Sequence, residues 1–184
     1  MKHNINNFLA AVFLTGCVSA SIASDICNIQ PGSIVCGKGT VENLTGNGMV
    51  STKGTIVSGP TKVNGLLSSK NTTFSSLNIN GSVNLIQCDV TGDTEVKGTL
   101  NASYTRFNSK VDAYSSSITL INTKVAGDLR ILHTTNKQQY VYLDDSSEVS
   151  GNVIFDDGKG EVVIRKHSKI GGKIIGGHLT SSSS

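Results

Sequence analysis

Two cysteines of this 184-residue chain stand close enough in the sequence to form a disulfide. Cys27 and Cys36 are nine residues apart, and the turn-forming residues Pro31 and Gly32 lie between them. In an oxidising compartment, such a pair closes a small ring and stabilises a fold by roughly 2–3 kcal/mol through loop entropy. We predict a Cys27–Cys36 disulfide that pins the N-terminal end of the fold, with two free thiols as the alternative. Neither a Cys-x-x-Cys pair nor a nearby histidine supports a metal site here.

Four aspartates are the candidates for acid–base or metal chemistry. They form the pairs Asp144-Asp145 and Asp156-Asp157, each next to Ser or Gly, where Asp is an ordinary turn residue. Glycoside cleavage needs two carboxylates that face one groove, and a calcium site needs carboxylates and carbonyls in one loop. The EF-hand and nonapeptide calcium patterns are absent from the sequence. We interpret the four aspartates as turn residues, and we predict no catalytic residue, no metal site and no cofactor.

The remaining polar residues form no catalytic pattern either. His133, His167 and His178 have no acidic or serine partner at an informative spacing, so we interpret them as surface residues. The sequence has no Gly-x-Ser-x-Gly elbow of a serine hydrolase. Neither Gly171-Gly172 nor Gly176-Gly177 is followed by the Lys-Ser/Thr of a phosphate-binding loop. These observations predict a protein that is not an enzyme.

The start of the chain has the features of an export signal. Residues 8–15 are apolar, too few to span a bilayer and typical of the hydrophobic region of a signal peptide. Leu14-Thr15-Gly16-Cys17 looks like a bacterial lipobox, in which Cys17 would become the lipidated first residue, whereas Ser21-Ile22-Ala23 looks like an ordinary signal-peptidase site. We predict that residues 1–24 are a signal peptide. Lipidation would place the protein at the outer membrane, and ordinary cleavage would leave it periplasmic or secreted.

Beyond residue 60, a repeat of short apolar stretches must position any functional side chain. Alternate residues are apolar and a glycine stands in the middle of each unit, so the period of two indicates strands rather than helices. The three clearest units are Val63-x-Gly65-x-Leu67, Ile79-x-Gly81-x-Val83 and Val96-x-Gly98-x-Leu100. Their spacing is almost constant, and Gly, Asn, Asp and Ser interrupt them as turn residues do. Self-similarity at a nearly fixed period is the signature of a repeat architecture.

We therefore predict an all-β, single-domain parallel β-helix with coils of about 16–21 residues. The repeated glycine is expected on the outward face or at a bend, where no Cβ is needed. Cys88 aligns with Thr123 in the repeat, so we expect it to be a small buried residue and not a nucleophile. The residues expected to point inward are Val63, Leu67, Ile79, Val83, Val96 and Leu100. An antiparallel sandwich is the alternative, but it has no need for inward residues at a constant offset.

The expected organisation divides the chain after the signal peptide into three parts. Residues 25–59 would form an N-terminal cap and the first coils, residues 60–177 the regular solenoid, and residues 178–184 a polar tail. Within the solenoid, Ser115-Ser116-Ser117 is expected to form an exposed turn or a small insertion.

Charge and composition narrow the range of functions. The net charge of +3 is small, and Lys and Arg are scattered, so nucleic-acid binding is not expected. Aromatic residues make up only 5% of the chain and Trp is absent. A compact globular core usually needs more large apolar side chains, whereas a solenoid buries only a small set per coil.

The repeat resembles that of a known protein family. Val-x-Gly-x-Leu units with Val-Asn-Gly and Val-x-Gly-Asp steps, over roughly residues 54–177, resemble those of the bactofilin-like, polymer-forming β-helix proteins. The resemblance implies the solenoid fold and carries over no functional residues. Bactofilins of this kind are mainly cytoskeletal and have no export signal, so the cytoskeletal role does not transfer to this chain.

Taken together, these features predict a non-enzymatic, exported cell-envelope protein that presents a rigid β-solenoid for scaffolding, self-association or binding to envelope proteins. Its contact with the membrane would be a lipid on Cys17. One alternative is an accessory subunit of a larger envelope or secretion assembly. Another is a small carbohydrate-active β-helix enzyme, which would carry acidic side chains from adjacent coils in one groove.

Overall fold

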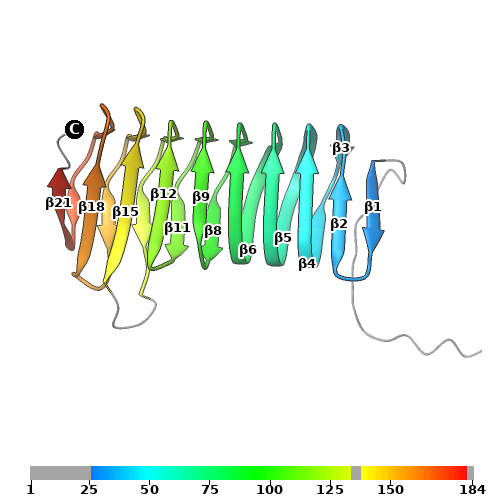
Figure 1. The fold of residues 1–184 in the computed structure, drawn as a ribbon, viewed down its shortest axis with the longest axis horizontal. Helices are drawn as coiled ribbons and strands as arrows, with labels where there is room; N and C mark the ends of the chain where they lie inside the picture. Colours follow the sequence, from blue (N-terminus) through cyan, green and yellow to red (C-terminus); the bar gives the residue numbers. More distant parts are fainter. Residues whose placement is uncertain (1–25, 134–137, 182–184) are drawn as a thin grey trace, which may run out of the picture.

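In the computed structural model, which describes residues 26–133 and 138–181, parallel strands stack into a β-solenoid of about eight turns (Figure 1). The predicted fold is confirmed. Among these residues, no helix is long and apolar enough to cross a membrane. Cys17 and the proposed signal peptide lie outside the described residues.

The strands form three stacks that run along the solenoid, and each coil contributes one segment to each stack. The first stack contains β3 (Gly39–Val41), β7 (Asp89–Val90), β10 (Arg106–Phe107), β13 (Lys124–Val125), β16 (Glu148–Val149) and β19 (Lys169–Ile170). The second contains β8 (Thr94–Lys97), β11 (Val111–Tyr114), β14 (Leu129–Ile131), β17 (Val153–Phe155) and β20 (Ile174–Ile175). The third contains β2 (Ser33–Cys36), β9 (Leu100–Ser103), β12 (Ser117–Ile121), β15 (Gln139–Asp144), β18 (Gly160–Ile164) and β21 (Gly177–Ser181).

Four further strands complete the fold. Three long ones turn from one stack into the next without interruption: β4 (Leu44–Lys53), β5 (Thr55–Lys70) and β6 (Thr73–Ile86). The first strand, β1 (Cys27–Gln30), is antiparallel to β2 and lies at the N-terminal end of the solenoid (Figure 1). In-register parallel pairing runs from β2 onward, and β21 extends into the segment that the sequence analysis assigned to a polar tail.

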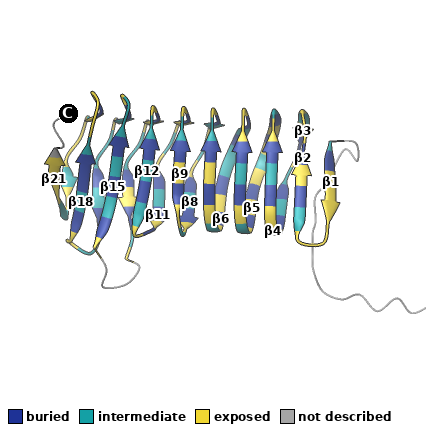
Figure 2. Cartoon of the chain, in the orientation of Figure 1, coloured by how far each residue is buried: buried dark blue, intermediate teal, exposed yellow. Residues whose placement is uncertain are grey.

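Equivalent residues of the sequence repeat are strand partners in successive coils. Ile79 pairs with Val63 on one side and with Val96 on the other, and Val83 lies between Leu67 and Leu100 in the same way. All six side chains are buried, so the predicted inward assignment is confirmed. Successive side chains of a strand point into and out of the solenoid, so buried residues alternate with more exposed ones along most strands (Figure 2).

The repeated glycine marks a bend between the second and third stacks. Gly65, Gly81 and Gly98 have φ values of 138°, 145° and 145°, which side-chain-bearing residues rarely adopt. The glycines also lie directly over one another in the register of β5 and β6. A Cβ on any of the three would collide with the carbonyl oxygen of the glycine one coil earlier. Glycine is therefore required here both by the backbone conformation and by the close approach of the coils.

A column of small buried residues lines the corner before the first stack. The backbone N–H of Cys88 donates to Oγ1 of Thr105 over 3.3 Å, and the N–H of Thr105 donates to Oγ1 of Thr123, also over 3.3 Å. The expected alignment of Cys88 with Thr123 is thus confirmed, two coils apart. The whole column consists of Thr55, Thr72, Cys88, Thr105, Thr123, Ser147 and Ser168.

Coils lengthen along this column toward the C-terminus. The sequence separation between neighbouring members is 17 from Cys88 to Thr105 and 18 from Thr105 to Thr123. It rises to 24 from Thr123 to Ser147 and is 21 from Ser147 to Ser168. The regular spacing of the earlier coils therefore does not extend past Thr123.

Candidate functional site

The structure brings the two predicted disulfide cysteines together. Cys27 on β1 and Cys36 on β2 are direct neighbours across the antiparallel pair, with α-carbons 4.0 Å apart and sulfurs at disulfide-bonding distance. The turn between the strands contains Pro31 and Gly32, and Gly32 has the positive φ of 74° that a tight turn requires. The third cysteine that the structure describes, Cys88, is free and buried. Burial raises the pKa of its thiol, because the thiolate would be desolvated.

The aspartates considered for catalysis do not share a groove. Asp144 ends β15 in the third stack, where its carboxylate lies 3.7 Å from Nζ of Lys166 and accepts a hydrogen bond from the backbone N–H of Asp145. Asp156 follows β17 in the second stack, where Arg130 donates to both of its oxygens over 2.9 and 3.2 Å. This contact raises the pKa of the Arg130 guanidinium. Each carboxylate therefore pairs with a cation at its own corner.

The other aspartates and histidines weighed for chemistry lie at turns or on the surface. Asp145 has a φ of 51° and lies in a turn, as expected for an Asp next to Ser. His167 occupies a similar corner with a φ of 62°, and exposed His178 lies beside Glu161 in the register of β18 and β21. No group of three or more His, Cys, Asp or Glu residues that could hold a metal ion occurs within residues 26–133 and 138–181.

One contact between two of these residues was not predicted. Nδ1 of exposed His133 lies against the Oδ1 of Asp157, one coil away and 24 residues later in the sequence. The spacing in the sequence does not predict this contact, because the coil between His133 and Asp157 is longer than the coils that define the repeat. Only the register of β14 with β17 brings the two residues together.

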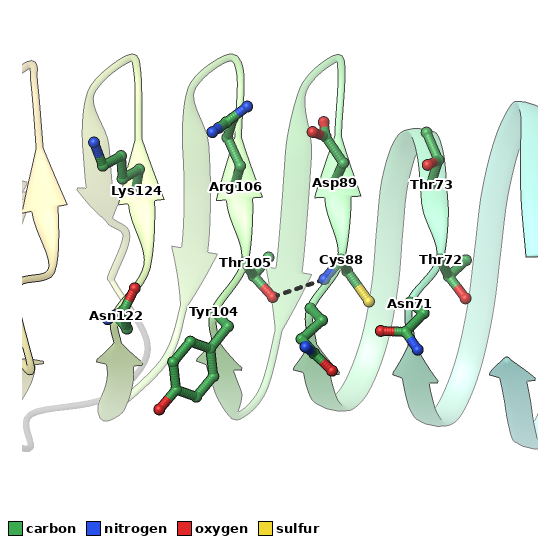
Figure 3. Close-up of a pocket in the computed structure, with 11 residues that line it drawn as sticks. Asn71, Thr72, Thr73, Cys88, Asp89, Tyr104, Thr105, Arg106, Asn122 and Lys124 are labelled. Carbon is green, nitrogen blue, oxygen red and sulfur yellow. Dashed lines mark hydrogen bonds between the residues drawn. The ribbon is translucent and has the colours of Figure 1, made fainter. Parts of the chain in front are cut away.

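A polar groove runs over four successive coils at the corner before the first stack (Figure 3). Its volume is about 630 Å³. One side is a row of corner residues, Asn71, Gln87, Tyr104 and Asn122. The other side is a row of outward residues from the first stack, Thr73, Asp89, Arg106 and Lys124. Between the rows lies the buried column that contains Thr72, Cys88 and Thr105, which forms the floor of the groove (Figure 3).

The corner row has an unusual backbone conformation. Asn71, Gln87, Tyr104 and Asn122 have φ values between 46° and 55°. Asn tolerates this left-handed region well, but Gln and Tyr do not. One coil before Asn71, Gly54 occupies the same corner with a φ of 70°. Glycine is therefore compatible with this position of the coil.

Charges of both signs occur on the other side of the groove. Asp89 accepts a hydrogen bond of 2.6 Å from Nδ2 of Asn108, and Lys124 lies 3.8 Å from the carboxylate of Glu148. Arg106 stands between Asp89 and Lys124 in the strand register. The residues of this groove differ in type from coil to coil, and only the register aligns them, so no sequence pattern predicts the groove.

The N-terminal end of the solenoid is closed over its core. Strand β1 covers the free edge of β2, and the side chain of Ile26 packs over Gly39. The inward residues of the first coil, Ile34, Cys36, Val41 and Leu44, are consequently all buried. Strand β1 and Ile26 therefore lie over the first coil.

The C-terminal end is open by comparison. In the part of the chain that the structure describes, β19, β20 and β21 each pair on one side only, with β16, β17 and β18. Leu179 continues the inward column that holds Val141 and Val162, yet it is 53% exposed. Ile170 and Ile174, the other inward residues of this coil, are only partly buried. Among the described residues, the last coil therefore presents the apolar side chains and strand edges that elsewhere receive the next coil.

Comparisons of the chain with protein-family models, with curated proteins and with solved structures find no match. The structure identifies a β-helix repeat protein, and the resemblance to bactofilin-like proteins depends on the repeat residues alone.

Proposed function

We propose that this protein is a non-enzymatic structural component of the cell envelope, whose solenoids join end to end through the open C-terminal coil. The observation that carries the proposal is the difference between the two ends. The inward residues of the first coil are buried beneath a cap, whereas Leu179 in the last coil is half-exposed. Free strand edges are a template for pairing with another chain.

A second copy of the same chain is the partner that fits this end best. The surface that covers a coil elsewhere in the molecule is another coil with the same three strands and the same inward columns. Two C-terminal coils that meet about a twofold axis would each supply Leu179, Ile174 and Ile170 to a shared apolar layer.

The carboxylates support a structural role over catalysis. Asp144 and Asp156 lie in different stacks, and each is paired with a cation, Lys166 or Arg130. Glycoside cleavage requires two carboxylates on either side of one bond. The small carbohydrate-active enzyme considered as an alternative therefore has no matched pair at these positions.

Sedimentation equilibrium of the mature protein tests end-to-end association. We expect a dimer that Leu179→Asp converts to a monomer, because an unpaired charge would be buried in the joint. Leu66→Asp is the matched control, since Leu66 is 40% exposed on an outward face of the third stack. A monomer at every concentration, or equal dissociation by both substitutions, would contradict the proposal. A stable hetero-complex that Leu179→Asp dissolves would favour the accessory-subunit alternative.

We further propose that the protein is exported and anchored by a lipid on Cys17. Support comes from the lipobox-like sequence and from the Cys27–Cys36 pair, since disulfides persist in oxidising compartments. Metabolic labelling with a fatty acid, followed by membrane fractionation, tests this point. We expect label in the membrane fraction of the wild type and neither label nor anchoring in Cys17→Ala. Unlabelled wild type in the soluble fraction would instead indicate cleavage at the Ser21-Ile22-Ala23 site.

A further inference from the structure

We propose that the corner groove between Asn71 and Lys124 binds a neutral glycan chain. This inference goes beyond the proposed assembly and does not depend on it, because the groove lies on the side of the solenoid rather than at its open end. It crosses four coils, and every coil supplies one residue to each of its two sides (Figure 3).

Gln87 and Tyr104 occupy a backbone conformation that glycine would adopt more easily. Both residues are held in the left-handed region, with φ values of 55° and 52°, although neither favours it. Gly54 shows that glycine fits the equivalent corner of an earlier coil. Unfavourable conformations of this kind persist where a side chain has a use. The same corner is left-handed at Ser146 and His167, which do not line the groove, so the conformation itself belongs to the fold. The long side chains of Gln87 and Tyr104, in place of a glycine, stand beside the groove, and this choice of residue supports a use there.

The side chains that line the groove can form hydrogen bonds with sugar hydroxyls. Asn71, Gln87 and Asn122 each offer both hydrogen-bond donors and an acceptor. A sugar hydroxyl also donates and accepts hydrogen bonds, so a side-chain amide can either donate to it or accept from it. Tyr104 is 57% exposed and presents a flat ring with a polar tip, which suits packing against the face of a sugar ring. Asp89 and Arg106 add an acceptor and a planar donor group on the opposite side.

The lining argues against other classes of partner. A nucleic acid or another polyanion would require a basic stripe, but here Arg106 stands next to Asp89 and Lys124 lies near Glu148. An apolar ligand or an amphipathic helix would require an apolar floor, whereas Thr72 and Thr105 lie at the bottom. An extended peptide that adds a strand needs a free edge, and β7 and β10 are paired on both sides.

The repetition of the groove suits a linear polymer. Successive coils are about 4.8 Å apart, the spacing of neighbouring strands. A chain of similar units that runs along the solenoid axis would therefore meet a corner residue and an outward residue at each coil. Polar contacts repeated in this way give an extended site without any single deep pocket.

Binding to an array tests the proposal directly. The labelled mature protein would be applied to immobilised chitohexaose, cellohexaose, xylan and mannan, with heparin and single-stranded DNA as polyanions. We expect binding to at least one neutral glycan. Binding to none of the four, or to the polyanions alone, would overturn the proposal.

Two variants separate a role in binding from a role in folding. Tyr104→Gly removes the ring and also relieves the left-handed strain, so we expect an unchanged or raised melting temperature and at least tenfold weaker binding to the preferred neutral glycan. Tyr114→Ala is the matched control, because Tyr114 is an exposed tyrosine on β11, outside the groove, and should bind like the wild type. Wild-type binding by Tyr104→Gly, or an equal loss in Tyr114→Ala, would refute the assignment. Because the array detects monomers and dimers alike, this result is independent of end-to-end association.

Discussion

Gly81 lies directly over Gly65, so close that a Cβ on Gly81 would collide with the carbonyl oxygen of Gly65. The colliding atom belongs to the backbone of a paired strand and cannot rotate away. We therefore predict that Gly81→Ala destabilises the protein by at least about 3 kcal/mol, since it adds a steric clash to an unfavourable φ of 145°. Urea denaturation followed by circular dichroism measures the loss.

Gly158 provides the control for this substitution. Its φ is 68°, but nothing lies within 4 Å of the position that a Cβ would occupy. Gly158→Ala should cost only about 1 kcal/mol, the penalty of the left-handed conformation alone. Equal losses for both substitutions would show that the close stacking of Gly81 on Gly65 contributes nothing.

The Cys27–Cys36 bond is predicted to secure the N-terminal cap. Mass spectrometry of the unreduced protein should find the peptide two hydrogens lighter than its reduced form. Replacing both cysteines by Ser should cost roughly 2–3 kcal/mol of loop entropy and should raise hydrogen exchange in β1 and β2 first. Recovery of both residues as free thiols from undisturbed cells would contradict this role.

Cys88 is predicted to make stability sensitive to alkaline pH. Burial raises the pKa of the folded thiol, so the unfolded chain loses this proton more easily. The contribution of Cys88 is therefore complete below the ordinary pKa of a thiol and declines as the pH rises from there to the raised pKa. Cys88→Thr should fold normally, because Thr72 and Thr105 occupy the same column, and should lose this alkaline decline. Rapid alkylation of Cys88 in the folded protein would contradict its burial.

Asp144 and Asp156 are predicted to have no catalytic role. The double substitution Asp144→Asn with Asp156→Asn should leave association and glycan binding unchanged and should cost only a little local stability, since both ion pairs are solvent-accessible. The mature protein should show no hydrolase or lyase turnover on a panel of polysaccharides. Turnover that either substitution alone abolishes would restore the enzyme hypothesis.

The fold could be predicted from the sequence because residues that stack in successive coils are separated by a nearly constant number of residues. Val63, Ile79 and Val96 are inward at nearly equal offsets. Phe74 and Phe107, which have the same separation in the sequence as Val63 and Val96, are likewise both buried. A constant offset of apolar residues is sufficient to define which side chains stack on which.

Where the number of residues per coil changes, the sequence no longer predicts which residues are buried. Ser115 was expected in an exposed turn, but it is buried, donates to the carbonyl of Ser117 over 2.7 Å and accepts from Gln139 Nε2 at its own carbonyl. Ser115 occupies the position of Gly98 one coil later, so the row of bend glycines ends at this coil. Polar residues also lack a constant identity, so neither the corner groove nor the His133–Asp157 contact has a pattern that the sequence displays.

The most direct test of the proposed function is the shape of the assembled protein in solution, measured by small-angle X-ray scattering. If two solenoids join through their C-terminal coils, the longest dimension should be about twice that of Leu179→Asp, with an unchanged cross-section. The Leu66→Asp control should match the wild type. A wild type with the length of a single solenoid, or an assembly with a wider cross-section, would contradict end-to-end association.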